Sequence, residues 1–307
     1  MMTAMRKTGY SAALAATLLL TGCFHEMHEL RTSEYGDGVP VGYLGTVPRW
    51  ELDADEGTPI HAITLSVAGG NASFTRKYAN VEGLADECLQ LPAGEYDLLV
   101  TVNMDDADGY SVSGLPATRT DMLNGDVSVS LKEPASSPAQ AWFGVEHVAI
   151  QEDAVTLATP SLQRLLPSLT VKVANVPAGA RISYSIAGVA QSVNLMAKDG
   201  NGRLGLPGPS GAGNLVPAVQ TSSGLDGFRL MPTAKDAARS LLTLDIFSAS
   251  GLPLTCICDA PLLECGKEYT LDLDYGTIRS YMYIDSYSIS PWQDGWTISG
   301  EILNPQE

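Results

Sequence analysis

The sequence predicts an all-β protein that consists of two tandem β-sandwich domains. Apolar and polar residues alternate in short segments along most of the chain, which is typical of strands with one buried face. The 30 glycines and 18 prolines supply frequent turns, and helical periodicity is poor throughout. Charged residues make up only 17% of the chain, which favours a turn-rich globular protein over a disordered acidic one.

The N-terminus has the features of an export signal. Arg6 and Lys7 precede an uncharged, mostly apolar run from Ser11 to Leu20, which is shorter than the roughly 20 residues of a membrane span. Leu20-Thr21-Gly22-Cys23 follows and resembles the lipobox of bacterial lipoproteins. We therefore expect residues 1–22 to be a lipoprotein signal peptide. Cys23 is the predicted lipid attachment site, which would hold the protein at the outer membrane through covalent acyl chains such as palmitate.

Residues 23–45 are predicted to be a lipidated tether, because they are polar and rich in glycine towards their end. The formal charge of the whole chain is −17, and removal of Arg6 and Lys7 takes it to −19. A chain this acidic repels phosphate backbones, so no nucleic-acid partner is expected.

Beyond the tether, seven segments show the strand pattern in order. Such half-apolar strands at short spacing are what a sandwich needs, with one face to the core and one to water. The apolar faces are Ile63-Leu65-Val67, Tyr96-Leu98-Val100-Val102, Val127-Val129-Leu131, Leu169-Val171-Val173, Ile182-Tyr184-Ile186, Leu242-Leu244-Ile246 and Tyr269-Leu271-Leu273-Tyr275. In the second of these, Leu99 and Thr101 fall on the opposite, solvent-facing side.

Two tandem domains are predicted, at 46–153 and 154–307. Leu91-Pro-Ala-Gly94 and Val176-Pro-Ala-Gly179 each precede a predicted strand, as similar turns would in two related domains. Glu133–Gln140 is the most linker-like stretch, and the alternative is a loop late in the first domain. Only Ser161–Leu166 and Thr233–Ser240 could form a helical turn or two.

The chain resembles the Bacteroidetes fimbrial lipoproteins of the FimB-type minor and anchor subunits. The resemblance lies in the lipobox, in Leu91–Val100, and in the stretch from Trp142 to Asn175. It also includes the C-terminal segment that ends Trp296–Leu303. Acidic residues after Cys23 are similar to the surface-export signals of lipoproteins in this group.

The resemblance implies two transthyretin-like sandwiches and a non-enzymatic role in pilus assembly and cell adhesion at the cell surface. It also implies fimbrial (pilin) partner subunits that bind by strand donation or edge pairing. The C-terminal strands are the expected partner-facing elements, because aromatic residues gather there. These residues could equally close the core of the second domain; they are Tyr281, Tyr283, Tyr287, Trp292 and Trp296.

No catalytic, cofactor-binding or metal-binding residues are predicted. His25, His28, His61 and His147 do not have zincin spacing. No histidine follows Ser210, as an elbow-type hydrolase would require. Asp105-Asp106-Ala107-Asp108 could bind calcium, although an acidic hairpin tip explains these residues equally well.

The remaining cysteines are Cys88, Cys256, Cys258 and Cys265. In an exported protein a disulfide from Cys265 to Cys256 or Cys258 is plausible, and free buried thiols are the alternative. Cys256 and Cys258 should face the same side of one strand.

The leading hypothesis is a minor or anchoring fimbrial subunit. The first alternative is a glycan- or ligand-binding lipoprotein of a nutrient-uptake system, with Trp50, Trp142, Trp292 and Trp296 as an aromatic platform for sugars. An enzyme is the least favoured alternative, because no catalytic constellation is recognisable.

Overall fold

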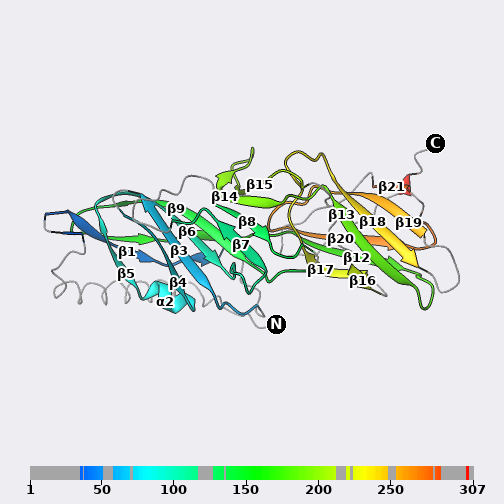
Figure 1. Ribbon diagram of the computed structural model, residues 1–307, viewed down its shortest axis with the longest axis horizontal. Coiled ribbons are helices and arrows are strands. Elements are labelled where there is room, and N and C mark those ends of the chain that lie inside the picture. Colours follow the sequence, from blue (N-terminus) through cyan, green and yellow to red (C-terminus); the bar gives the residue numbers. More distant parts are fainter. Residues whose placement is uncertain are drawn as a thin grey trace, which may run out of the picture.

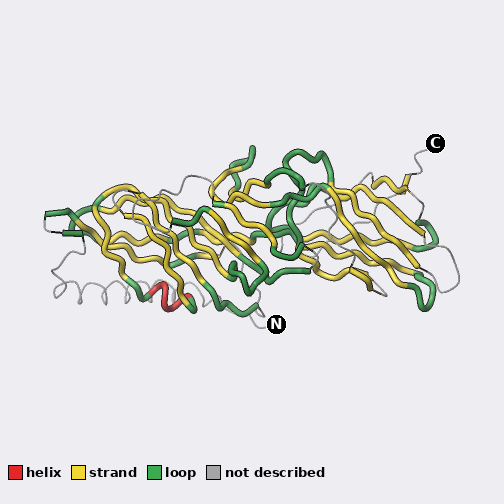
Figure 2. Tube along the Cα trace, viewed as in Figure 1, coloured by secondary structure: helices red, strands yellow, loops and turns green. Residues whose placement is uncertain are grey.

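The computed structural model describes residues 35–36, 38–50, 58–69, 72–116, 127–134, 136–211, 219–221, 224–247, 254–278, 281–284 and 302–303. Within them almost every regular element is a strand, as Figure 2 shows, and the strands form five sheets. The all-β prediction is therefore confirmed. The predicted signal peptide and Cys23 lie outside the described residues. The described part of the chain contains no helix with the length and hydropathy of a membrane span.

The first sandwich packs a three-stranded sheet on a six-stranded sheet. The smaller sheet has the order β10-β1-β5, with β1 (Val41–Thr46), β5 (Cys88–Pro92) and β10 (Val155–Ala158). The larger has the order β2-β11-β9-β6-β3-β4, with β2 (Arg49–Trp50), β3 (Ile63–Gly69), β4 (Ala72–Tyr78), β6 (Gly94–Val102), β9 (Trp142–Ile150) and β11 (Ser161–Arg164). Leu44, Leu65 and Val100 lie in the buried core between the two sheets.

The second sandwich repeats this arrangement with later strands. Its three-stranded sheet has the order β17-β12-β20, with β12 (Ser168–Ala174), β17 (Gly224–Arg229) and β20 (Glu268–Asp274). Its six-stranded sheet has the order β16-β13-β18-β19-β21-β22, with β13 (Arg181–Ala187), β16 (Val219–Thr221), β18 (Ser240–Phe247), β19 (Leu254–Ala260), β21 (Tyr281–Ile284) and β22 (Ile302–Leu303). Val171, Tyr184 and Leu244 are among its core residues.

A four-stranded sheet connects the two sandwiches. Its order is β15-β14-β8-β7, with β7 (Tyr110–Ser113), β8 (Ser128–Leu131), β14 (Ser192–Lys198) and β15 (Leu204–Pro207). Strands β7 and β8 come from the first half of the chain and β14 and β15 from the second, and Val129 pairs with Val193 across the junction. We call it the bridging sheet. It lies between the two sandwiches along the long axis of the molecule (Figure 1).

The bridging sheet buries the second face of the central strand β6. On one face, Leu98, Val100 and Val102 pack in the core of the first sandwich. On the other face, Leu99 is 0% exposed and belongs to a core cluster that continues into the second sandwich. The prediction that Leu99 and Thr101 face solvent is therefore wrong, because both are buried.

The predicted apolar alternation is otherwise confirmed. In each of the seven predicted segments most of the apolar residues are buried, and only Leu131 and Tyr275 are partly buried. Cross-strand pairing supplies the backbone hydrogen bonds that such strands require, for example along the whole length of β3 with β6.

Both helical predictions are wrong. Ser161–Arg164 forms strand β11, which pairs with β9 and β2. Thr233 forms an isolated bridge with Val189, turns and bends follow, and Ser240 is the first residue of β18. Within the described residues the one helix is the short α2 (Val81–Ala85), which sequence reasoning missed. The Asn80 side chain accepts a hydrogen bond from the backbone N–H of Gly83 and caps the start of this helix.

The first sandwich extends beyond its predicted range of 46–153 at both ends. Strand β1 begins at Val41, inside the predicted tether of residues 23–45, and pairs with β5 and β10. Strands β10 and β11 lie beyond the predicted boundary at 153 but belong to the sheets of the first sandwich. The passage between the sandwiches is therefore the three-residue segment 165–167, in which Leu165 and Leu166 are buried. The described residues of the stretch Glu133–Gln140 lie in a loop between β8 and β9, as the alternative interpretation held.

Candidate functional site

The predicted partner-facing segment begins at one edge of the second sandwich. Strand β21 pairs in parallel with β19, and β22 pairs antiparallel with β21. Tyr281 and Tyr283 therefore lie on a strand next to the outermost described strand of this sheet. The structure does not describe their side chains, and Tyr287, Trp292 and Trp296 lie outside the described residues. That these five residues face a partner stays a prediction.

This sheet edge can bind another extended segment through its main chain. The outer side of an edge strand carries backbone N–H and C=O groups that have no neighbour within the sheet. Among the described strands, β22 is outermost at one side of the six-stranded sheet and β16 at the other. In Figure 1 β21 lies at the end of the molecule opposite the first sandwich. We call β21 and β22 the C-terminal edge.

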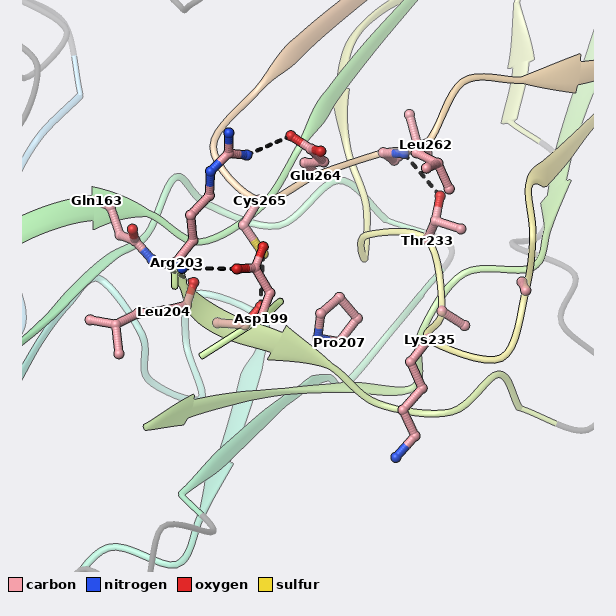
Figure 3. Close-up of a pocket in the computed structure, with 14 residues that line it drawn as sticks. Gln163, Asp199, Arg203, Leu204, Pro207, Thr233, Lys235, Leu262, Glu264 and Cys265 are labelled. Atoms are coloured by element: carbon pink, nitrogen blue, oxygen red, sulfur yellow. Dashed lines mark hydrogen bonds and ion pairs between the residues drawn. The ribbon is translucent and has the colours of Figure 1, made fainter. Parts of the chain in front are cut away.

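A cavity of about 270 Å³ lies where the bridging sheet meets the second sandwich (Figure 3). The hairpin of β14 and β15, the segment 233–237 and the segment 262–265 form most of its wall. The lining includes both charged and apolar side chains, among them Asp199, Arg203, Leu204, Leu262, Glu264 and Cys265.

Ion pairs close one rim of this cavity. Arg203 Nη1 lies 2.7 Å from Glu264 Oε2, and Lys267 pairs with the same carboxylate. Partial burial acts to raise the pKa of Glu264, but the hydrogen bonds from Lys267 and Arg203 outweigh it, so the pKa lies below its usual value. The Asp199 side chain accepts hydrogen bonds from the backbone N–H groups of Asn201 and Arg203, both at 2.8 Å, and fixes the hairpin turn.

Strand β15, which lines the cavity, is poorly suited to pair with an added strand. The side-chain amide of Gln163 donates to the carbonyl oxygen of Leu204 at 2.9 Å, and the Cys265 thiol contacts that of Gly205 at 3.7 Å. Pro207 has no N–H to donate. Edge strands are commonly protected in this way, so strand addition at β15 is disfavoured.

Of the two alternatives that the sequence left open for Cys256, Cys258 and Cys265, the structure contains thiols rather than a disulfide. Cys88, Cys256, Cys258 and Cys265 are not joined in disulfides. Cys256 and Cys258 point to the same side of β19 as predicted, are fully buried, and have sulfur atoms 3.6 Å apart. Cys265 instead lines the cavity, and burial raises its pKa to about 12. A thiol that stays protonated is a poor nucleophile.

Two of the histidines pair with carboxylates. His147 on β9 lies between Asp97 and Glu95 on β6, at 2.8 and 3.0 Å. The hydrogen bond that His147 donates to Asp97 is the main cause that raises the pKa of His147. His61 contacts Asp108. The described residues contain no cluster of three or more His, Cys, Asp or Glu side chains that could hold a metal ion. Calcium at Asp105–Asp108 therefore gains no support, and His25 and His28 lie outside the described part.

The aromatic platform of the glycan-binding alternative is not available at Trp142. This residue is only 2% exposed, and the Trp50 ring packs edge-on against it at 5.3 Å between centroids. A sugar needs an open aromatic face, so this pair stabilises the first sandwich instead. Trp292 and Trp296 lie outside the described residues.

Sequence reasoning missed the cavity and the contact between His61 and Asp108. Arg203 and Glu264 are 61 positions apart, and His61 and Asp108 are 47 apart. Neither pair belongs to a short motif, so only the strand order brings them together. The one local signal was the acidic turn at Asp105–Asp108.

Comparison with known proteins identifies related families and structures. A family profile for the fimbrillin-A associated anchor proteins Mfa1 and Mfa2 matches residues 68–299. A search of curated proteins found no match.

Three solved structures are similar over most of the chain. One is a Bacteroides thetaiotaomicron protein proposed to bind polysaccharides, with 15% identity, 79% of this chain and 91% of that chain covered, and a TM-score of 0.47. A second is the tip fimbrial protein Mfa3 of Porphyromonas gingivalis with a C-terminal truncation, with 12% identity, 82% and 100% covered, and a TM-score of 0.45. A third is the fimbrial anchor protein Mfa2 of the same organism, with 13% identity, 66% and 76% covered, and a TM-score of 0.40.

Proposed function

Because the chain belongs to the family of fimbrillin-A associated anchor proteins Mfa1 and Mfa2, we propose that it is a minor or anchoring subunit of a fimbria. The resemblance predicted from the sequence is thereby confirmed at the level of the family, and the role of the chain is fimbrial and adhesive. The match from residue 68 to residue 299 is the observation that carries the proposal, because it includes most of both sandwiches and the start of the C-terminal edge. The location is the cell envelope or cell surface, and the role is structural rather than catalytic.

The proposed attachment is covalent lipid on Cys23, which would hold the chain in the outer membrane. The short positive region, the apolar run and the lipobox-like Leu20–Cys23 support it. Several acyl chains give durable membrane attachment, since each buried methylene contributes about 0.8 kcal/mol. The proposed partners are other fimbrial subunits, which contact the C-terminal edge by main-chain pairing.

Metabolic labelling with an alkyne fatty acid tests the lipid. Wild type should take up the label and fractionate with the outer membrane. Cys23→Ala should lose both properties, while the control Cys88→Ala should keep them. Membrane retention of unlabelled Cys23→Ala would contradict lipid attachment without affecting the fimbrial role.

Gene deletion tests the fimbrial role itself. Cells that lack the protein should shed pili into the medium or carry short pili or none, and wild-type complementation should restore them. Electron microscopy and immunoblots of the medium measure both outcomes. Surface pili that are unchanged in length, number and attachment would overturn the proposal.

Site-specific photo-crosslinking tests the partner-facing edge. A photoreactive residue in place of Leu303 on β22 should capture another fimbrial subunit. The control position is Leu157 on β10, which is 37% exposed and lies in the first sandwich. Capture from Leu157 but not from Leu303 would place the interface on the first sandwich.

A further inference from the structure

An acidic turn joins β6 to β7 and fixes one carboxylate in place. The Asp105 side chain accepts hydrogen bonds from the backbone N–H groups of Ala107 at 2.9 Å and Asp108 at 3.1 Å. Such a turn is a common use of aspartate in loops. It also places the backbone N–H of Asp108 against the Asp105 carboxylate, and the two carboxyl groups are close enough for each to shift the pKa of the other.

Asp108 is unusual in this turn because it is buried and incompletely paired. Its side chain is 5% exposed, and its Oδ1 lies 2.8 Å from His61 Nε2. Its Oδ2 is buried without any hydrogen-bond partner. A buried carboxylate oxygen that accepts no hydrogen bond costs free energy, which is why buried polar atoms are almost always paired.

We propose that Asp105 and Asp108 form a proton-binding site, in which Oδ2 of Asp108 carries one proton and donates it to the carboxylate of Asp105. A protonated Oδ2 becomes a donor, so the unpaired oxygen gains a partner and the two carboxyl groups no longer repel each other. In this state the His61 ring donates its Nε2–H to Oδ1 of Asp108.

The titration behaviour of the pair agrees with this arrangement. Burial, followed by the hydrogen bond with Asp105, raises the pKa of Asp108, and the attraction of His61 only partly offsets it. Burial acts to raise the pKa of Asp105 too, but hydrogen bonds from Asp108 and Ala107 and the charge of Lys77 bring it below its usual value. The two carboxyl groups therefore have separated pKa values, as groups that share one proton do.

The other charged groups near this site are few. Asp106 points outward and pairs with Lys132 at 2.9 Å, with its side chain 81% exposed. Tyr110, the first residue of β7, lies two positions after Asp108. Burial raises the pKa of the Tyr110 phenol, so the phenol stays neutral. The charge of Lys77 also acts on Asp105, and the titration of the site is assigned to Asp105 and Asp108.

The site lies beside the segment that reaches the second sandwich. The backbone N–H of Ala139 donates to the Asp108 carbonyl oxygen at 3.2 Å, and the Tyr110 hydroxyl donates to the Ala139 carbonyl oxygen. Arg229 on β17 donates to the Pro138 carbonyl oxygen at 3.1 Å and to Gln140 Oε1 at 2.8 Å. Loss of the proton would leave two repelling carboxylates at this contact between the sandwiches, so its stability should depend on pH.

The sign of this dependence follows from the two shifts. Because the pKa of Asp108 is raised on folding, its contribution to stability is present at low pH and is lost as the pH rises through the folded value. Because the pKa of Asp105 is lowered, its contribution is lost as the pH falls through its own folded value. The singly protonated pair is therefore most stabilising between the two values.

Asp108→Asn tests the proposal, because the amide of asparagine is a permanent donor with the shape of a protonated carboxyl group. Melting temperatures of the full chain should be measured from about pH 4 to about pH 8. The melting temperature of Asp108→Asn should rise relative to that of the wild type as the pH rises, by about 2 °C or more at the upper end of the range. The control Asp106→Asn, which changes an exposed carboxylate in the same turn, should follow the wild type in parallel.

Carbon-13 NMR of wild-type protein labelled in its aspartate carboxyl groups gives a second measurement that does not depend on a variant that folds. The Asp108 carboxyl signal should titrate well above the ordinary aspartate pKa of about 3.9 and the Asp105 signal below it. A melting difference between Asp108→Asn and wild type that is constant across pH would overturn the shared proton. Two carboxyl groups that both titrate near the ordinary value would also overturn it.

Discussion

The substitution Leu99→Ala tests whether the second face of β6 is a buried face. Leu99 is 0% exposed and belongs to the same core cluster as Val129 of the bridging sheet and Phe143 of β9. Truncation of a buried leucine to alanine removes its transfer free energy and leaves a cavity, which together cost about 2–5 kcal/mol. We expect Leu99→Ala to lower the free energy of unfolding by this amount, as much as Leu98→Ala does on the opposite face.

Urea denaturation followed by tryptophan fluorescence measures the effect. Trp142 lies on β9, which pairs with β6, and is 2% exposed, so its emission should report the loss of the first sandwich. The control Leu241→Ala removes a leucine that is 41% exposed on β18, and it should change the free energy of unfolding by about 0.5 kcal/mol or less.

The comparison of Leu98→Ala with Leu99→Ala decides whether the second face of β6 is buried. If Leu98→Ala were strongly destabilising but Leu99→Ala no more so than Leu241→Ala, then Leu99 would face solvent. The bridging sheet would not cover β6, and the reasoning that joins the two sandwiches through one core would be refuted.

Three further predictions follow from local geometry. Gly144→Ala should destabilise the protein by about 1–3 kcal/mol, because a Cβ at this position would lie 2.4 Å from a backbone carbonyl oxygen of β11. The control Gly200→Ala should be nearly neutral in the same denaturation assay, because a Cβ at residue 200 would meet no atom within 4 Å. Glu264 has a lowered pKa, so its contribution to stability is present above the unfolded value and lost as pH falls; the melting-temperature gap between wild type and Glu264→Gln should shrink from about pH 5 to about pH 3. Cys256 and Cys258 should resist alkylation in the native protein and react in denaturant without reductant, and alkylation that requires reductant would show a disulfide instead.

The strand positions could be predicted from the sequence because a strand with one face in solvent has alternating polar and apolar residues. Where one face of a strand meets water, as in β20, polar residues occupy every second position and the period is visible. In β6 both faces are buried, so Leu98, Leu99 and Val100 form a continuous apolar run. Such a run shows that a second layer covers the strand, but it does not show which later segment supplies that layer.

The misassigned helix at Ser161–Leu166 has a related cause. Leu162, Leu165 and Leu166 have helical spacing, and all three are buried. They are buried in two different ways, since Leu162 lies on β11 in the first core and the other two lie in the passage to the second sandwich. Pairing of β11 with β9 and β2 decides the backbone conformation, and these partners are distant in sequence. Tertiary pairing therefore outweighs the local pattern.

The same long-range pairing decides how the two sandwiches behave as a unit. A chain of two domains with a polar linker could bend at that linker. Here the passage at 165–167 is buried, the bridging sheet takes two strands from each half of the chain, and one core cluster extends from Leu99 to Ile278. Under the proposed attachment through Cys23 and the proposed partner contact at the C-terminal edge, a pulling force would enter the described structure at β1 in the first sandwich and leave it at β21 and β22 in the second. In this molecule the force would pass through paired strands and packed side chains, so separation of the sandwiches requires that the shared core be broken.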